Sequence, residues 1–177
     1  LLSVILCFVP LFNLLAFEFC LAATCALTLV HGVASAYKLR GSDLTVIKRW
    51  QLSCFYLLGP CIALLVPILA NGIFVRNCNW WEGFQLFAFL VIGGGIVSSG
   101  FAAGCAAISK RGHWFFLGIW LLAAAVAVGR FFLSPQVDVF TLFGGYFPGA
   151  LYDEVIQQQE RILWSRFEDL WLTASFV

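Results

Sequence analysis

Four long apolar stretches constrain the fold of this chain more than any other feature. They cover residues 14–36, 51–74, 83–108 and 114–132, and each contains at most one charged side chain. About 20 helical residues cross ~30 Å of hydrocarbon, so each stretch is long enough to span a bilayer. The pattern predicts an all-α integral membrane bundle with four transmembrane helices within residues 1–133.

The composition supports this class and excludes several others. Only 11% of the 177 residues are charged and 62% are hydrophobic, whereas soluble domains carry roughly 25% charged residues. The net charge of +1 provides no basic field for a phosphate backbone. A soluble monomer, a disordered tail, a coiled coil and a nucleic-acid-binding protein are therefore excluded.

The apolar sequence begins upstream of the first span. Residues 1–37 would reach about 55 Å as one helix, which is longer than an ordinary crossing. Pro10 and Asn13 interrupt this run. We therefore expect residues 1–12 to form a separate interfacial or re-entrant segment. A single tilted helix kinked near Pro10, or a complete additional crossing, is the alternative.

Lysine and arginine gather in two of the connections between spans. They are Lys38, Arg40, Lys48, Arg49, Lys110 and Arg111. With four spans, both connections lie on the same side of the membrane. Because basic loops stay in the cytoplasm, we expect these two there and the C-terminal tail on the opposite side.

Small residues recur at four-residue spacing in the third stretch. The two adjacent stripes include Gly94, Gly95, Ser98, Ser99, Ala102 and Ala103. Lipid gives helices no hydrophobic reason to associate, so small residues that allow close packing mark the helix interfaces. We expect this helix to form the centre of the bundle. A lining for a substrate or lipid path is the alternative interpretation.

Two charged side chains lie inside the predicted spans, where charge is expensive. Glu18 lies about one turn inside the first span, and Arg130 lies at a similar depth in the fourth. Because these two spans run antiparallel, we expect an intramembrane Glu18–Arg130 ion pair. A proton or ion site, or snorkelling of Arg130 to the headgroups, is the alternative.

His31 and His113 both lie near the basic ends of their spans. Imidazole is a good axial ligand, which makes the pair weak candidates for haem or chlorin binding. No flanking motif supports a cofactor or a metal, and we expect neither. Ser98 and Ser99 lie near the middle of their span, away from both histidines, which argues against a serine-based intramembrane enzyme.

The chain changes character after residue 133. Residues 134–152 are rich in aromatic residues, glycine and proline, and predict an interfacial loop. Residues 153–177 show helical periodicity and predict an amphipathic helix, either on the membrane surface or docked on a partner. The residues expected to dock the partner are Ile156, Ile162, Leu163, Phe167, Leu170 and Trp171.

Two short strings carry a family resemblance. Arg76, Asn77 and Cys78 follow the second span, and GYFPGALYDE occupies residues 145–154. Together they resemble a group of poorly characterised bacterial polytopic membrane domains, although Asn79 stands where those domains have an acidic residue. The resemblance implies a multi-pass protein of a bacterial inner membrane. It implies no peptidase activity here, because the chain has no HExxH motif or other protease signature.

These features favour a non-enzymatic membrane subunit or anchor. Such a protein would pack in a larger complex with other membrane subunits and dock a partner through its C-terminal helix. A component of a transporter or permease is the alternative, although the matching broken helices of many transporters are not found in the sequence. A haem- or chlorin-binding subunit is a third possibility.

Overall fold

The computed structural model describes residues 1–10, 12–75, 80–133, 139–147 and 155–176. Most of these residues are helical. In chain order the elements are α1 (Leu2–Cys7), α2 (Phe17–Lys38), α3 (Val46–Asn71), α4 (Trp80–Leu86), the π-helix η1 (Phe87–Ile92), α5 (Gly93–Ile108), α6 (Gly112–Leu133), the strands β1 (Val139–Thr141) and β2 (Gly145–Phe147), and α7 (Val155–Phe176).

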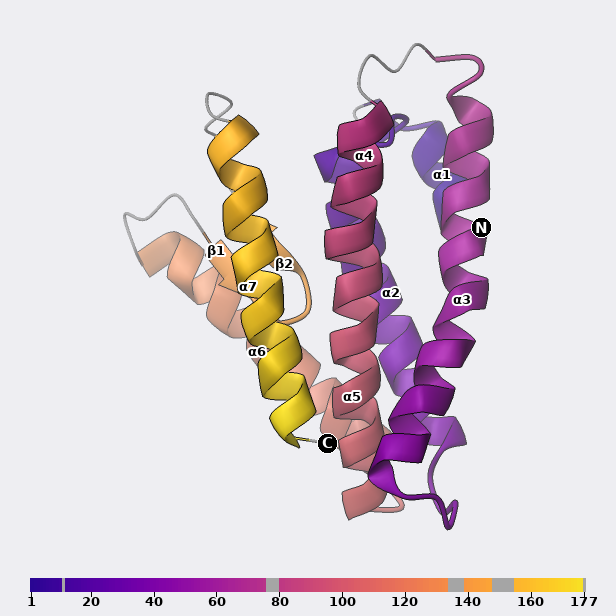
Figure 1. Cartoon of the computed structure of the whole chain (residues 1–177), viewed down its shortest axis with the longest axis vertical. Coiled ribbons are helices and arrows are strands. Elements are labelled where there is room, and N and C mark those ends of the chain that lie inside the picture. The colour runs from indigo at the N-terminus through magenta and orange to yellow at the C-terminus, as the bar shows by residue number, and fades with distance from the viewer. Residues whose placement is uncertain (11, 76–79, 134–138, 148–154, 177) are drawn as a thin grey trace.

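Four helices are long and apolar enough to cross a membrane. They cover Phe17–Lys38, Val46–Asn71, Trp80–Ile108 and Gly112–Arg130, and the third of them joins α4, η1 and α5 into one rod. The four stand side by side with their connections at the two ends of the bundle (Figure 1). The prediction of an all-α membrane bundle is confirmed.

Helix α5 lies at the centre of the bundle and packs on α2, α3, α6 and α7. Its glycines explain how closely the neighbouring helices approach. A methyl group at Gly95 would lie only 2.6 Å from Leu57 Cδ1 of α3. Ser98, Ser99, Ala102 and Ala103 are fully buried. The third span is therefore the interior helix, as its small residues predict.

The N-terminal segment is separate from the first span. α1 contains six residues, which amounts to about 9 Å of helix and cannot cross a bilayer. Ser3 Oγ donates a hydrogen bond to the Leu64 carbonyl at 2.7 Å, and this contact holds α1 against α3. The chain turns after α1, and α2 begins at Phe17. Residues 1–10 and 12–16, as far as the structure describes this segment, form neither a continuous kinked helix nor an additional crossing.

A β-hairpin occupies part of the region predicted to be an interfacial loop. β1 and β2 pair antiparallel, with Phe140 opposite Tyr146. Phe143 at the tip of the hairpin is 3% exposed, and its ring lies 5.6 Å from the Phe101 ring and 5.7 Å from the Phe116 ring. Phe143 therefore fills a space between α5 and α6, a packing that the sequence did not predict.

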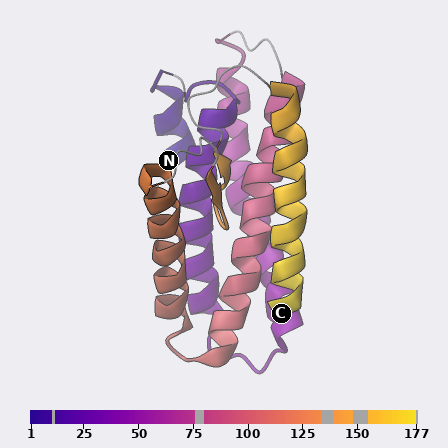
Figure 2. The same ribbon diagram turned by 90° about the vertical axis from the view of Figure 1, so that its left-hand side faces the viewer.

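Helix α7 runs lengthwise along α5 and also contacts η1 and β2. It begins at the end of the bundle opposite the two basic connections and extends towards them (Figures 1 and 2). The sequence predicted an amphipathic helix lying on the membrane surface or on a partner. In the structure, one face of α7 packs on the chain's own third span.

Candidate functional site

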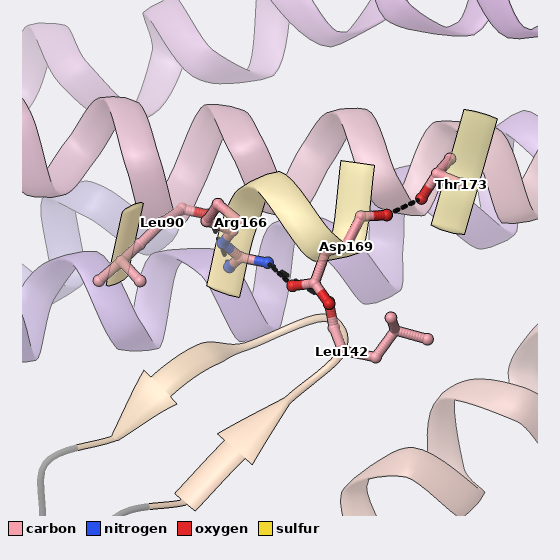
Figure 3. A network of polar contacts seen from close by, with 5 residues as sticks. All are labelled: Leu90, Leu142, Arg166, Asp169 and Thr173. Atoms are coloured by element: carbon pink, nitrogen blue, oxygen red, sulfur yellow. Dashed lines mark hydrogen bonds and ion pairs between the residues drawn. The ribbon is translucent and has the colours of Figure 1, made fainter. Parts of the chain in front are cut away.

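The most deeply buried charged side chain in the described residues is Arg166 of α7, which is 3% exposed. Its Nη1 pairs with Asp169 Oδ2 at 3.2 Å and donates to the Leu142 carbonyl at 3.3 Å. Its Nη2 donates to the Leu90 carbonyl at 3.4 Å. Figure 3 shows the guanidinium between the π-helix and the hairpin loop. One side chain thus connects α7 to two other elements.

The third span is shaped to receive this guanidinium. Leu90 lies in η1, and a π-helical turn inside an α-helix frequently occurs at a functional site. A methyl group at Gly94 would lie 3.3 Å from Arg166 Nη2 and 2.9 Å from the Phe143 carbonyl oxygen. Glycine at this position therefore leaves room for both the arginine and the hairpin.

The electrostatics of the Arg166–Asp169 pair are dominated by burial. Burial raises the pKa of Asp169 to about 6, while the charge and the hydrogen bond of Arg166 act in the opposite direction. Burial also lowers the pKa of Arg166, and Asp169 opposes that change. Arg166 Nε has no hydrogen-bond partner within the described residues. The ion pair lies within α7 and compensates the charge of Arg166, whose bonds to the Leu90 and Leu142 carbonyls attach α7 to the bundle. Loss of Asp169 would leave a buried guanidinium without its counter-charge, which is costly.

The two faces of α7 differ in burial. Leu170 packs on the cluster that contains Phe143, and Thr173 is fully buried, with its Oγ1 donating to the Asp169 carbonyl at 2.7 Å. The exposed side chains among the described residues of α7 are Trp164, Phe167, Glu168, Trp171, Leu172, Ala174 and Ser175. The inner face is therefore formed by Arg166, Leu170 and Thr173.

This division corrects the predicted docking face. The sequence placed Phe167, Leu170 and Trp171 on one apolar face, whereas Leu170 points into the bundle and the other two side chains are 58% and 75% exposed. In this orientation of α7, Arg166 reaches the carbonyls of Leu90 and Leu142. The side chains of Ile156, Ile162 and Leu163 lie outside the described residues.

A second polar site surrounds His31 in α2. Its Nε2 lies 3.0 Å from Ser99 Oγ of α5 and 3.4 Å from Ser53 Oγ of α3. Ser35 Oγ lies at the same distance of 3.4 Å, one turn along α2. His31 is only 6% exposed. The imidazole therefore links three spans through hydroxyl groups.

Further hydroxyl contacts continue along the same face of α2. Ser98 Oγ donates to the Thr28 carbonyl at 2.7 Å, and Trp120 Nε1 of α6 donates to Thr28 Oγ1 at 3.1 Å. Our sequence analysis missed this polar face. The sequence does indicate it, because four polar residues lie four, three and four positions apart, as on one face of a helix. They are Thr24, Thr28, His31 and Ser35.

The contact between His31 and Ser99 corrects the expectation that the serines lie away from both histidines. A serine within hydrogen-bond reach of a histidine is one requirement for nucleophilic catalysis. Here, however, three hydroxyls share one imidazole nitrogen, and Ser99 is completely buried. This arrangement is typical of an interhelical clamp.

The second histidine has different surroundings. His113 lies in the first turn of α6, where its ring makes an edge contact with Tyr37 at 5.5 Å between centroids and lies near Trp114. The neighbours of His113 are aromatic, whereas those of His31 are hydroxyls. Within the described ranges, His, Cys, Asp and Glu side chains form no group of three that could hold a metal ion.

The structure does not bring Glu18 and Arg130 together. Glu18 lies in the first turn of α2 and is half-buried, whereas Arg130 is exposed in the last turn of α6. Among the described side chains, the ion pair within 4.0 Å is Arg166–Asp169. The exposure of Arg130 fits the snorkelling alternative, in which the flexible stem carries the charge towards the headgroups.

Residues 76–79 and 148–154, which carry most of the family resemblance, lie outside the described residues. Comparison of the chain with protein-family models, with curated proteins and with solved structures found no match. Functional inference for this chain therefore rests on the contacts of Arg166 and His31 described above.

Proposed function

We propose that this chain is a non-enzymatic membrane subunit that serves as a scaffold in a larger membrane complex. The proposal rests mainly on the division of α7. Arg166 attaches one face of this helix to the bundle, while Trp164, Phe167 and Trp171 on the other side are more than half exposed. A helix held in this way is pre-organised to present its outer face to a second protein.

The chemistry of the outer face favours a protein partner over lipid. Exposed Glu168 directly follows exposed Phe167, and a carboxylate facing hydrocarbon is unfavourable. Aromatic side chains are enriched in protein interfaces and often dominate their binding energy. We therefore infer that other membrane subunits cover this face in the assembled complex.

The basic connections support an orientation for the subunit. They lie at one end of the bundle, and the positive-inside rule assigns that end to the cytoplasm. The first turn of α7 then lies towards the non-cytoplasmic side of the membrane. The strings at residues 76–78 and 145–154 support placement in a bacterial inner membrane.

Site-specific photocrosslinking in native membranes tests the partner surface. A photoreactive residue at Trp171 should form adducts with a protein. The matched control is Ile62, which is 59% exposed on the apolar span α3 and should form adducts mainly with lipid. If position 171 also forms only lipid adducts, the docking proposal is wrong.

A component of a transporter is the second candidate. The observation that favours it is the buried polar site formed by His31 with Ser35, Ser53 and Ser99, because polar groups inside spans often mark ion or substrate paths. Reconstitution of the purified chain in liposomes tests this alternative. Solute flux by the chain alone, abolished by His31→Leu, would favour transport over the scaffold role.

A further inference from the structure

The two basic connections form one surface at the end of the bundle. Tyr37, at the end of α2, touches His113, at the start of α6, with 5.5 Å between ring centroids. The exposed cations around this contact are Lys38, Arg40, Lys48, Lys110 and Arg111. Within residues 37–50 and 109–113, Asp43 is the only acidic residue. This end of the bundle therefore attracts anions.

Arg49 differs from these cations because it is buried, with only 9% of its surface exposed. Its Nη2 donates to the Ser42 carbonyl. Its Nε and Nη1 are buried and have no hydrogen-bond partner within the described residues. A buried guanidinium with unpaired donors is costly. The site therefore favours an additional acceptor, and an anion would compensate the charge as well.

Aromatic side chains at this end of the bundle contact two of the exposed cations. Arg40 Cζ lies 3.9 Å from the centre of the Tyr37 ring, and Lys38 Nζ lies 5.2 Å from the centre of the Tyr56 ring. Tyrosine and tryptophan concentrate where a bilayer meets water. These contacts hold two exposed cations beside the connection that Arg49 contacts through the Ser42 carbonyl.

We propose that Arg49 binds the phosphate group of an anionic phospholipid in the leaflet at this end. Guanidinium groups form strong charge-assisted hydrogen bonds with phosphate oxygens. Basic sites at the ends of spanning helices are suited to anionic headgroups. Residues 39–45 are mostly exposed and non-helical, and Gly41 has a φ of 69°. A headgroup reaches the guanidinium as this connection moves aside, and the exposed cations at this end of the bundle add to the attraction for its negative charge.

The test measures lipid binding by the whole chain in mild detergent. Phosphatidylglycerol should be retained in native mass spectra and should raise the melting temperature, whereas phosphatidylcholine should do neither. Arg49→Gln should weaken the affinity for phosphatidylglycerol by about tenfold, as expected for the loss of a charge-assisted hydrogen bond. The matched control, Lys48→Gln, removes the same charge from an exposed neighbour and should change the affinity by less than about twofold.

Three results would overturn the proposal. Equal losses in the Arg49→Gln and Lys48→Gln variants would show a general effect of charge. Equal retention of the two lipids by the unsubstituted chain would exclude anion selectivity, and this measurement does not require any variant to fold. Stabilisation by inorganic phosphate alone, at the same concentration, would assign the site to a free anion instead of a lipid.

Discussion

Arg166 shows how much one side chain contributes to the arrangement of this protein. Its guanidinium joins α7 to the π-helix and to the hairpin loop, and its own charge is paired with Asp169. In hydrocarbon or in a protein interior, a broken pair leaves an uncompensated charge. Arg166 therefore adds specific polar contacts to the apolar packing that holds α7 on the bundle.

Arg166→Gln should lower the free energy of unfolding by about 3 kcal/mol, because Asp169 would remain buried without its partner. Unfolding in mixed micelles measures the change, and proteolysis should show earlier release of α7. Arg130→Gln is the matched control, since Arg130 is exposed. Its effect should stay within about 0.5 kcal/mol. Equal effects of the two substitutions would contradict this account.

A substitution at Gly94 tests how closely the hairpin approaches α5. Gly94→Ala should destabilise the protein by about 1–3 kcal/mol, because the new methyl group would lie 2.9 Å from both the Phe143 carbonyl and Thr24 Cγ2. Gly118 in α6 has nothing within 4 Å of the corresponding position. Gly118→Ala should therefore be neutral or slightly stabilising. Thermal unfolding of the two variants side by side distinguishes a local clash from a general effect of glycine.

The hairpin and α7 pack against each other. β2 contacts α7, and the tip between the strands fills a space between α5 and α6. Two short strands are marginal by themselves, so this hairpin requires tertiary packing. The interfacial-loop prediction did not foresee this packing, because a Gly-rich aromatic segment has the same local character whether it lies in the headgroups or in a bundle.

Phe143→Ala should loosen both elements together. Removing a buried aromatic ring from a packed site costs about 3–5 kcal/mol in soluble proteins. Hydrogen exchange should therefore become faster in α7 as well as in β1 and β2, with little change in α3. The control is Phe132→Ala, since Phe132 is 78% exposed at the end of α6. If exchange changes only within the hairpin, the two elements are independent.

The whole molecule has three parts with different roles: the buried helix α5, the basic connections at one end of the bundle, and helix α7 packed along α5. α5 packs on α2, α3, α6 and α7, whereas α6 is much more open to its surroundings. Clustering of the basic connections at one end agrees with a single orientation in the membrane. The proposed lipid site at Arg49 and the proposed partner surface on α7 therefore lie on different surfaces of the molecule.

Labelling of introduced cysteines tests the proposed orientation. After the native cysteines are blocked in the folded protein, Lys48→Cys should react from the cytoplasmic side and Ile73→Cys from the other. Both positions are exposed, and they lie at opposite ends of α3. Membrane-impermeant maleimide added before and after permeabilisation provides the measurement. Reaction of both positions from the same side would show that α3 does not cross the membrane.

Hydropathy along the chain was sufficient to predict the number and approximate limits of the spans, because span length and apolar content are local properties. The small residues of the third span also predicted its interior position. The sequence did not indicate which polar groups meet. His31 and Ser99 are 68 positions apart, and Arg166 and Leu90 are 76 apart. Hydrogen bonds between such distant positions depend on how the helices pack and rotate, which only the tertiary structure decides.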